Sequence, residues 1–160
     1  MAGVGEPAMI VRPSTEQLLE DCARELLEEV LPVVAGEPAQ VRVHMLAAVL
    51  RNAAVRSAHE IAWMTEESAA AAAYGRSVLD ATGDPTLAGS LQALTAGQDP
   101  SLHLDDVAAR YALAGDALGH ALVAARRAGE ASLLERGEQL LDERLAHERL
   151  VMAGYGIVGR

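Results

Sequence analysis

Residues 104–128 decide the fold, and they read LDDVAARYALAGDALGHALVAARRA. Apolar side chains recur here at spacings of three and four, which place them on one face of an α-helix. This face consists of Tyr111, Ala114, Leu118, Ala121 and Ala125. Gly129 follows directly and is a typical helix stop, and a further helix is expected over residues 131–152. The small inward side chains predict helices that pack closely together.

Helix signals continue toward the N-terminus. Ser14 and Gln17 form a capping-box pattern, which predicts a helix from about residue 15 to 31, before Pro32. The next helix is expected from Pro38 to about residue 64. Thr65 with the two glutamates after it can begin a third helix that ends at Gly83, although residues 38–82 also fit one long kinked helix.

Two matching dipeptides, Asp84-Pro85 and Asp99-Pro100, are further helix starts, and a short helix with an apolar face is expected between them. Its apolar residues are Leu87, Leu91 and Leu94. These patterns predict an all-α, single-domain antiparallel bundle of five or six helices over residues 14–153. Residues 1–13 are expected to be a flexible arm, and residues 154–160 a flexible Gly-rich tail.

Composition excludes several classes of function. The net charge is −10, so nucleic acid is not an expected partner. All 13 basic residues are Arg, which removes any lysine nucleophile or phosphate-loop lysine. No apolar run is long enough for a membrane span, and no signal peptide is recognisable, so we expect a cytoplasmic protein without a membrane partner. Cys22 lies at helical spacing with Leu19 and Leu26 and is expected to be buried.

Two acid–histidine pairs suggest a metal site as an alternative. Asp116 precedes His120 by four residues, and Glu143 precedes His147 by four residues. If both pairs faced inward, a metal-dependent helical enzyme would be one interpretation. The spacing differs from the Glu-x-x-His of di-iron bundles, and such pairs also stabilise helix surfaces. We therefore expect no metal, no cofactor and no catalytic residues on this chain, which makes an enzyme the less favoured interpretation.

A polar face on the helix that begins at Pro38 is the predicted partner or ligand surface. Its central residues follow one another at helical spacing and include the single Trp of the chain. Trp and Arg are enriched at binding hot spots, and Arg also grips phosphates. The predicted surface comprises Arg42, Arg51, Asn52, Arg56, His59, Glu60 and Trp63.

Several short motifs carry a family resemblance. They are the stretch Arg12–Leu19, the run Leu27–Pro32 with Gly36, the pair Arg42-Val43, and Arg127-Ala128-Gly129-Glu130. Together they resemble a family of small helical bacterial proteins encoded beside aminoglycoside-phosphotransferase-like kinases and acyl-CoA dehydrogenases. One branch is the small subunit of the 4-hydroxyacyl-CoA kinase of levulinate catabolism. The resemblance is clearest over residues 12–51.

The resemblance implies a non-catalytic accessory subunit of a phosphotransferase-type kinase, acting on hydroxyacyl-CoA in acyl catabolism. The kinase partner would then supply the nucleotide cradle, the metal clamp and the base that phosphoryl transfer needs. A stand-alone homo-oligomeric binding or scaffold bundle is an alternative, because Ala-rich faces permit close packing between protomers.

Overall fold

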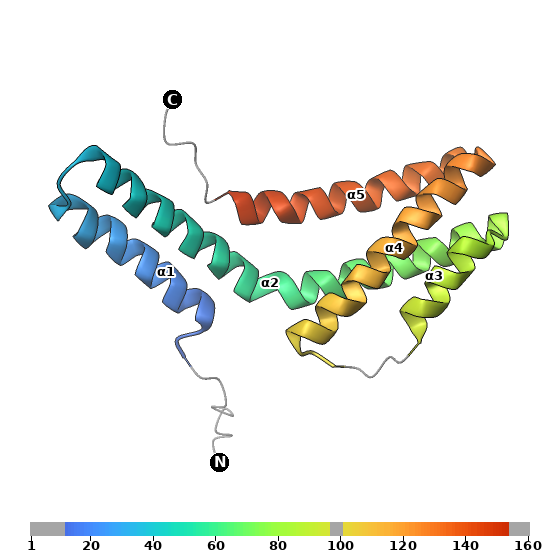
Figure 1. Cartoon of the computed structure of the whole chain (residues 1–160), viewed down its shortest axis with the longest axis horizontal. Helices are drawn as coiled ribbons and strands as arrows, with labels where there is room; N and C mark the ends of the chain where they lie inside the picture. Colours follow the sequence, from blue (N-terminus) through green and yellow to red (C-terminus); the bar gives the residue numbers. More distant parts are fainter. Residues whose placement is uncertain (1–11, 97–100, 154–160) are drawn as a thin grey trace, which may run out of the picture. The chain divides into compact units, whose positions relative to one another are not determined.

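The computed structural model describes residues 12–96 and 101–153, and these residues form helices without any strand. The helices are α1 (Thr15–Glu25), α2 (Glu37–Thr82), α3 (Pro85–Thr95), α4 (Leu104–Ala128) and α5 (Ala131–Met152) (Figure 1). Two short helical turns, η1 (Leu26–Val30, π-helical) and η2 (Leu31–Val33, 3-10), follow α1. The predicted all-α helical bundle is confirmed. The predicted arm and tail lie outside the described residues, apart from Arg12 and Pro13.

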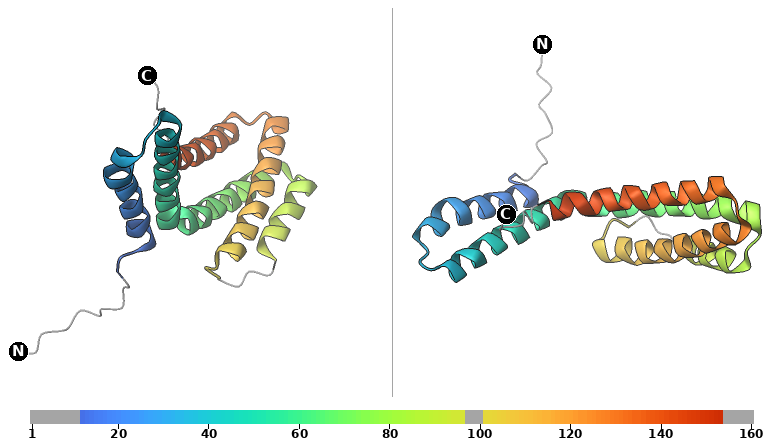
Figure 2. Two further views of the ribbon diagram at one scale, coloured as in Figure 1. Left: turned by 60° about the vertical axis from the view of Figure 1, so that its left-hand side comes forward. Right: turned by 90° about the horizontal axis from the view of Figure 1, so that it is seen from above.

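The chain divides into two compact units, and the boundary falls within α2. In unit 1, which ends at Ala58 and also takes in Val151 and Met152, α1 lies beside the first half of α2 (Figures 1 and 2). The capping box at the start of α1 is present: the Gln17 amide donates to Ser14 Oγ at 3.2 Å, and Gln17 Oε1 accepts from the Ser14 amide at 2.9 Å.

The burial of Cys22 is a prediction that the structure contradicts. Cys22 is exposed, and Ala23 is the buried residue of α1. Leu19 and Leu26, the expected neighbours of Cys22 on the stripe, are partly buried, and the tertiary contacts of α1 bury Ala23 rather than Cys22 between them. Pro32 lies inside η2, where the missing backbone donor is tolerated.

The alternative of one long helix over residues 38–82 describes α2 better than two separate helices. Thr65 does not cap a new helix. Its hydroxyl instead donates to the Ile61 carbonyl oxygen at 2.7 Å, within the same helix. This back-bonding to the preceding turn is a common alternative to capping for Ser and Thr. The helix ends at Thr82, and Gly83 follows with φ of 64°, a left-handed conformation that glycine adopts without strain.

Unit 2, residues 59–150, contains the second half of α2 together with α3, α4 and most of α5. Adjacent helices run antiparallel, and α3 lies beside α4 (Figures 1 and 2). The core combines large residues of α2 and α3 with alanines of α4. It includes Tyr74, Val78, Leu87, Leu91, Leu94, Ala114, Ala117, Ala121, Ala124 and Ala125. The predicted bounds of α4 and α5 and the three buried leucines of α3 are confirmed.

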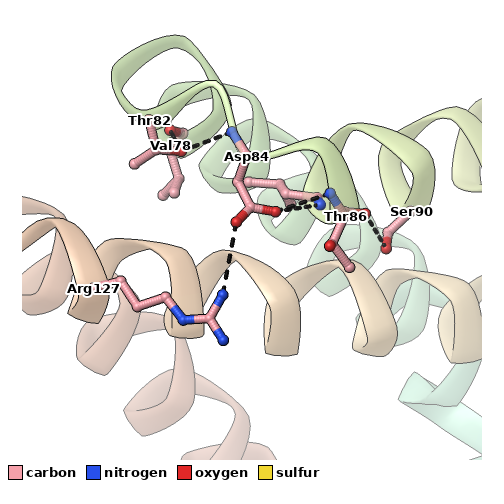
Figure 3. Close-up of polar contacts among 7 residues, drawn as sticks. Val78, Thr82, Asp84, Thr86, Ser90 and Arg127 are labelled. Atoms are coloured by element: carbon pink, nitrogen blue, oxygen red, sulfur yellow. Dashed lines mark hydrogen bonds and ion pairs between the residues drawn. The ribbon is translucent and has the colours of Figure 1, made fainter.

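The start of α3 shows how a local sequence signal positions a helix (Figure 3). Asp84 Oδ1 accepts hydrogen bonds from the amides of Thr86 and Leu87, at 2.9 and 3.0 Å. Its second carboxylate oxygen lies 4.0 Å from an Arg127 guanidinium nitrogen at the end of α4. Asp84 therefore caps α3 and also faces the basic end of α4. The matching Asp99-Pro100 lies outside the described residues.

A membrane span requires a helix that is both long and apolar. Among the described residues, no helix has both the length and the apolar character to cross a bilayer.

Gly137 lies where α5 approaches its neighbours in unit 2 closely. A Cβ at this position would overlap the Leu122 side chain and lie 2.7 Å from the Tyr74 hydroxyl oxygen. A methyl group in a helix interior normally stabilises by about 1 kcal/mol, but overpacking a core costs about 1–3 kcal/mol. We expect Gly137→Ala to lower the free energy of unfolding by about 1 kcal/mol or more, measured by urea denaturation.

Gly119→Ala is the matched control, because Gly119 lies in the interior of α4 and a Cβ there meets no atom of another residue within 4 Å among the described residues. This variant should raise the free energy of unfolding by about 0.5–1 kcal/mol. Equal gains in the two variants would contradict the close approach at Gly137.

Candidate functional site

A pocket of ≈ 270 Å³ opens in unit 2 among the second half of α2, α4 and α5. Small side chains make much of its wall, and polar side chains from all three helices surround it. The lining residues are Glu66, Glu67, Ala70, Ala71, Tyr111, Ala114, Gly115, Leu118, Leu140, Glu143, Arg144 and His147. Apolar walls with a few convergent polar groups are typical of small-molecule sites.

Glu67 is the centre of the polar cluster in this pocket. Its Oε2 accepts a hydrogen bond from the Tyr111 hydroxyl of α4 at 2.6 Å. Its Oε1 lies 2.7 Å from His147 Nδ1 of α5. One carboxylate of α2 thus joins two other helices, and its side chain is only 17% exposed. A carboxylate with both oxygens engaged is held in one orientation.

Tyr111 has a strongly altered acidity. Burial, the hydrogen bond to Glu67 and the negative charge of Glu67 raise its pKa to about 12, and the Arg144 guanidinium opposes this shift. Arg144 Cζ lies 5.3 Å from the centroid of the Tyr111 ring, a cation–π geometry. Tyr111 is therefore a neutral hydrogen-bond donor across the physiological pH range.

His147 is held by stacking as well as by its bond to Glu67. Its ring lies 4.5 Å from the Trp63 ring, centroid to centroid, with 9° between the planes. The His59 ring also stacks on Trp63, at 4.7 Å and 17°. Trp63 and Glu67 are four residues apart on α2, so both reach His147 from one face of that helix.

The geometry fixes the chemistry that His147 can perform. An ionised Glu67 only accepts hydrogen bonds, so the proton on His147 lies at Nδ1. In that tautomer, Nε2 carries the lone pair and is a hydrogen-bond acceptor. Within the described residues, no group of three or more His, Cys, Asp or Glu side chains is arranged to hold a metal ion.

The two acid–histidine pairs do not converge, because they line different pockets of unit 2. Glu143 and His147 line the pocket around Glu67. Asp116 and His120 line a second, shallower pocket beside α3. There, His120 Nδ1 lies 2.6 Å from Ser90 Oγ, a contact that the sequence did not suggest.

The residues of the predicted partner or ligand surface fall on both sides of the unit boundary within α2. In unit 1, Arg42 and Arg56 are exposed and Arg51 is partly exposed. Asn52 is only 8% exposed and, within the described residues, its Oδ1 has no hydrogen-bond partner. Asn52 therefore does not belong to an open surface, which corrects the expectation.

The remaining residues of that surface lie in unit 2, and none of them lines the pocket described above. His59 is exposed, and Glu60 and Trp63 are partly exposed. Trp63 contacts His147, so part of the predicted face is engaged within the protein itself. The sequence did not indicate Glu67, Tyr111 or Arg144, because residues far apart in the chain build this pocket.

Comparison with known proteins finds no match: no family model, no curated protein and no solved structure resembles this chain closely enough to be recorded.

The acidity of Tyr111 predicts a pH dependence of stability. In the folded protein its hydroxyl keeps its proton up to about pH 12, whereas the pKa of an unperturbed Tyr is 10.0. Between these values the unfolded chain binds fewer protons, so the free energy of unfolding falls as pH rises. Below pH 10 this contribution is fully present. Urea denaturation at a series of alkaline pH values measures the slope.

Tyr111→Phe removes this contribution and also the hydrogen bond to Glu67. We expect a loss of about 0.5–1.5 kcal/mol at neutral pH and a shallower alkaline slope than in the wild type. Tyr74, whose pKa burial also raises, retains its part of the slope in both proteins. Identical slopes above pH 10 would show that the Tyr111 proton is not held by the fold.

Proposed function

We propose that this chain is a non-catalytic, cytoplasmic accessory subunit of a phosphotransferase-type kinase, and that it binds the kinase through the first half of α2. The resemblance over residues 12–51 supports the class of partner, since it covers the same helix. The hydroxyacyl-CoA substrate follows from the resemblance alone. The structure of unit 1 supports the binding surface.

The observation that carries this proposal is a row of large apolar side chains on α2 that face solvent. Val41 is 43% exposed, Met45 59%, Leu46 55% and Val49 48%. Val41, Met45 and Val49 follow one another at intervals of four residues, which places them on one face of the helix. Exposed apolar side chains that lie side by side in this way are typical of protein–protein interfaces.

Arginines flank this row, as interface anatomy would require. Arg42 lies beside Val41 in the chain, and Arg56 continues the helical face seven residues beyond Val49. Both are exposed. An apolar centre with Arg at its edge is the composition enriched at specific interfaces. Part of the predicted surface, Arg42 and Arg56, therefore fits as the rim rather than as the centre.

A second copy of this chain is the other candidate for the same face. The row is apolar, and a twofold axis would bring identical rows together. Such a homo-oligomer would make the chain a scaffold rather than a kinase subunit. The two candidates differ in the oligomeric state that they predict for the isolated protein, since only the second predicts self-association.

The test is co-expression with a phosphotransferase-type kinase from the same genome, followed by size exclusion and a kinase assay. We expect co-elution and higher kinase activity with this protein than without it. Met45→Glu buries a charge in the interface and should abolish co-elution, because an unpaired buried charge costs several kcal/mol. Leu145→Glu is the control, since Leu145 is an exposed apolar residue of α5 in unit 2.

Two results would decide against the kinase subunit. Separate elution with unchanged kinase activity contradicts it directly. Light scattering of the isolated protein tests for self-association. A dimer that Met45→Glu converts to a monomer would assign the apolar row to contacts between two copies of this chain.

A further inference from the structure

We propose that the pocket around Glu67 binds a small organic cation, with an ammonium group on the acidic rim and a short apolar body against the small side chains of α2 and α4. This site lies wholly within unit 2. The apolar row proposed to bind the kinase lies in unit 1, so either proposal can fail without the other.

Small side chains in the pocket lining leave the volume that an apolar ligand body would occupy. Ala70 and Ala71 of α2 and Ala114 and Gly115 of α4 are all among its lining residues. A pocket of ≈ 270 Å³ is small compared with drug-sized sites of about 300–1,000 Å³. The ligand is therefore a compact molecule, about the size of a single ring or a short branched chain.

The charges around the pocket favour a cation. Three carboxylates line it, those of Glu66, Glu67 and Glu143, against one guanidinium, that of Arg144. The net charge of the chain, −10, adds a long-range attraction for cations. An anionic ligand that reached Arg144 would lie beside all three carboxylates, where repulsion opposes its binding.

The protein already places one organic cation at this site. The Arg144 guanidinium lies over the Tyr111 ring at 5.3 Å, and it does so from within the lining of the pocket. Carboxylates and an aromatic face together make the environment that holds ammonium and guanidinium groups in proteins. A ligand cation would find the three carboxylates there, while Arg144 already engages the Tyr111 ring.

The central carboxylate is fixed before any ligand arrives. Tyr111 and His147 hold the two oxygens of Glu67, and Trp63 supports His147 by stacking. Each carboxylate oxygen has a further lone pair, so the bonds to Tyr111 and His147 leave acceptor capacity for an ammonium donor. Preorganisation of this kind lowers the entropic cost of binding.

The experiment uses three probes of one shape and different charge: benzylamine as its ammonium ion, benzyl alcohol and benzoate. Trp63 is the only Trp of the chain and stacks on a residue that lines the pocket, so its fluorescence reports binding. Full-length protein is titrated at neutral pH and low salt. We expect saturable binding of benzylammonium with a dissociation constant in the millimolar range or below, and weaker binding of the other two.

Three single variants test where the charge acts. Glu143→Gln should weaken benzylammonium binding about two- to fivefold. The effect is modest because solvent screens the attraction between the Glu143 carboxylate and the ligand ammonium. Arg144→Gln should strengthen it, because the variant removes the competing positive charge. Glu138→Gln is the control, as Glu138 is an exposed acid of α5 outside the pocket lining. Unchanged urea midpoints confirm that each variant is folded.

The proposal is overturned if benzoate binds as tightly as benzylammonium, or if Arg144→Gln weakens binding of the cation. It is also overturned if none of the three probes changes the Trp63 emission at concentrations up to about 10 mM. Tight binding of benzoate would reassign the pocket to an anion held by Arg144.

Discussion

Unit 2 depends on how closely its helices approach α4. Five alanines of that helix are buried in the core, from Ala114 to Ala125, and they meet the large side chains of α2 and α3. Small residues allow short distances between helix axes, so the core gains its contact area from Tyr74 and the leucines of α3 rather than from α4 itself. Ala114 and Gly115 of the same helix also line the pocket, where their short side chains leave space. The packing rule and the candidate site therefore have the same origin.

Much of the fold follows from local signals in the sequence. The bounds of α4 and α5 and the caps at Ser14 and Asp84 were predictable because each depends on residues within one or two helical turns. Cys22 was predicted wrongly for a related reason. The apolar pattern of α1 is compatible with two rotations of the helix, and only the tertiary contacts, which bury Ala23, choose between them.

The candidate site was much less predictable. The bond from Tyr111 to Glu67 spans 44 residues, and the contact from His147 to Glu67 spans 80. Helical periodicity says which residues share a face of one helix, but not which face of another helix they meet. The sequence pointed to both Trp63 and His147 for other reasons. Trp63 was predicted to lie on a partner or ligand surface, and His147 was a candidate ligand of the alternative metal site. The structure unites them by stacking the two rings.

The contact between Tyr74 and Gly137 also limits how this sequence can evolve. The Tyr74 hydroxyl is buried and, among the described residues, has no hydrogen-bond partner, which costs about 1–3 kcal/mol. It lies where any side chain at position 137 would begin. A side chain at 137 then needs room from both the Tyr74 hydroxyl and the Leu122 side chain. A Phe at 74 removes the unsatisfied hydroxyl but only one of these two obstacles. In related chains, position 137 should therefore covary with both 74 and 122.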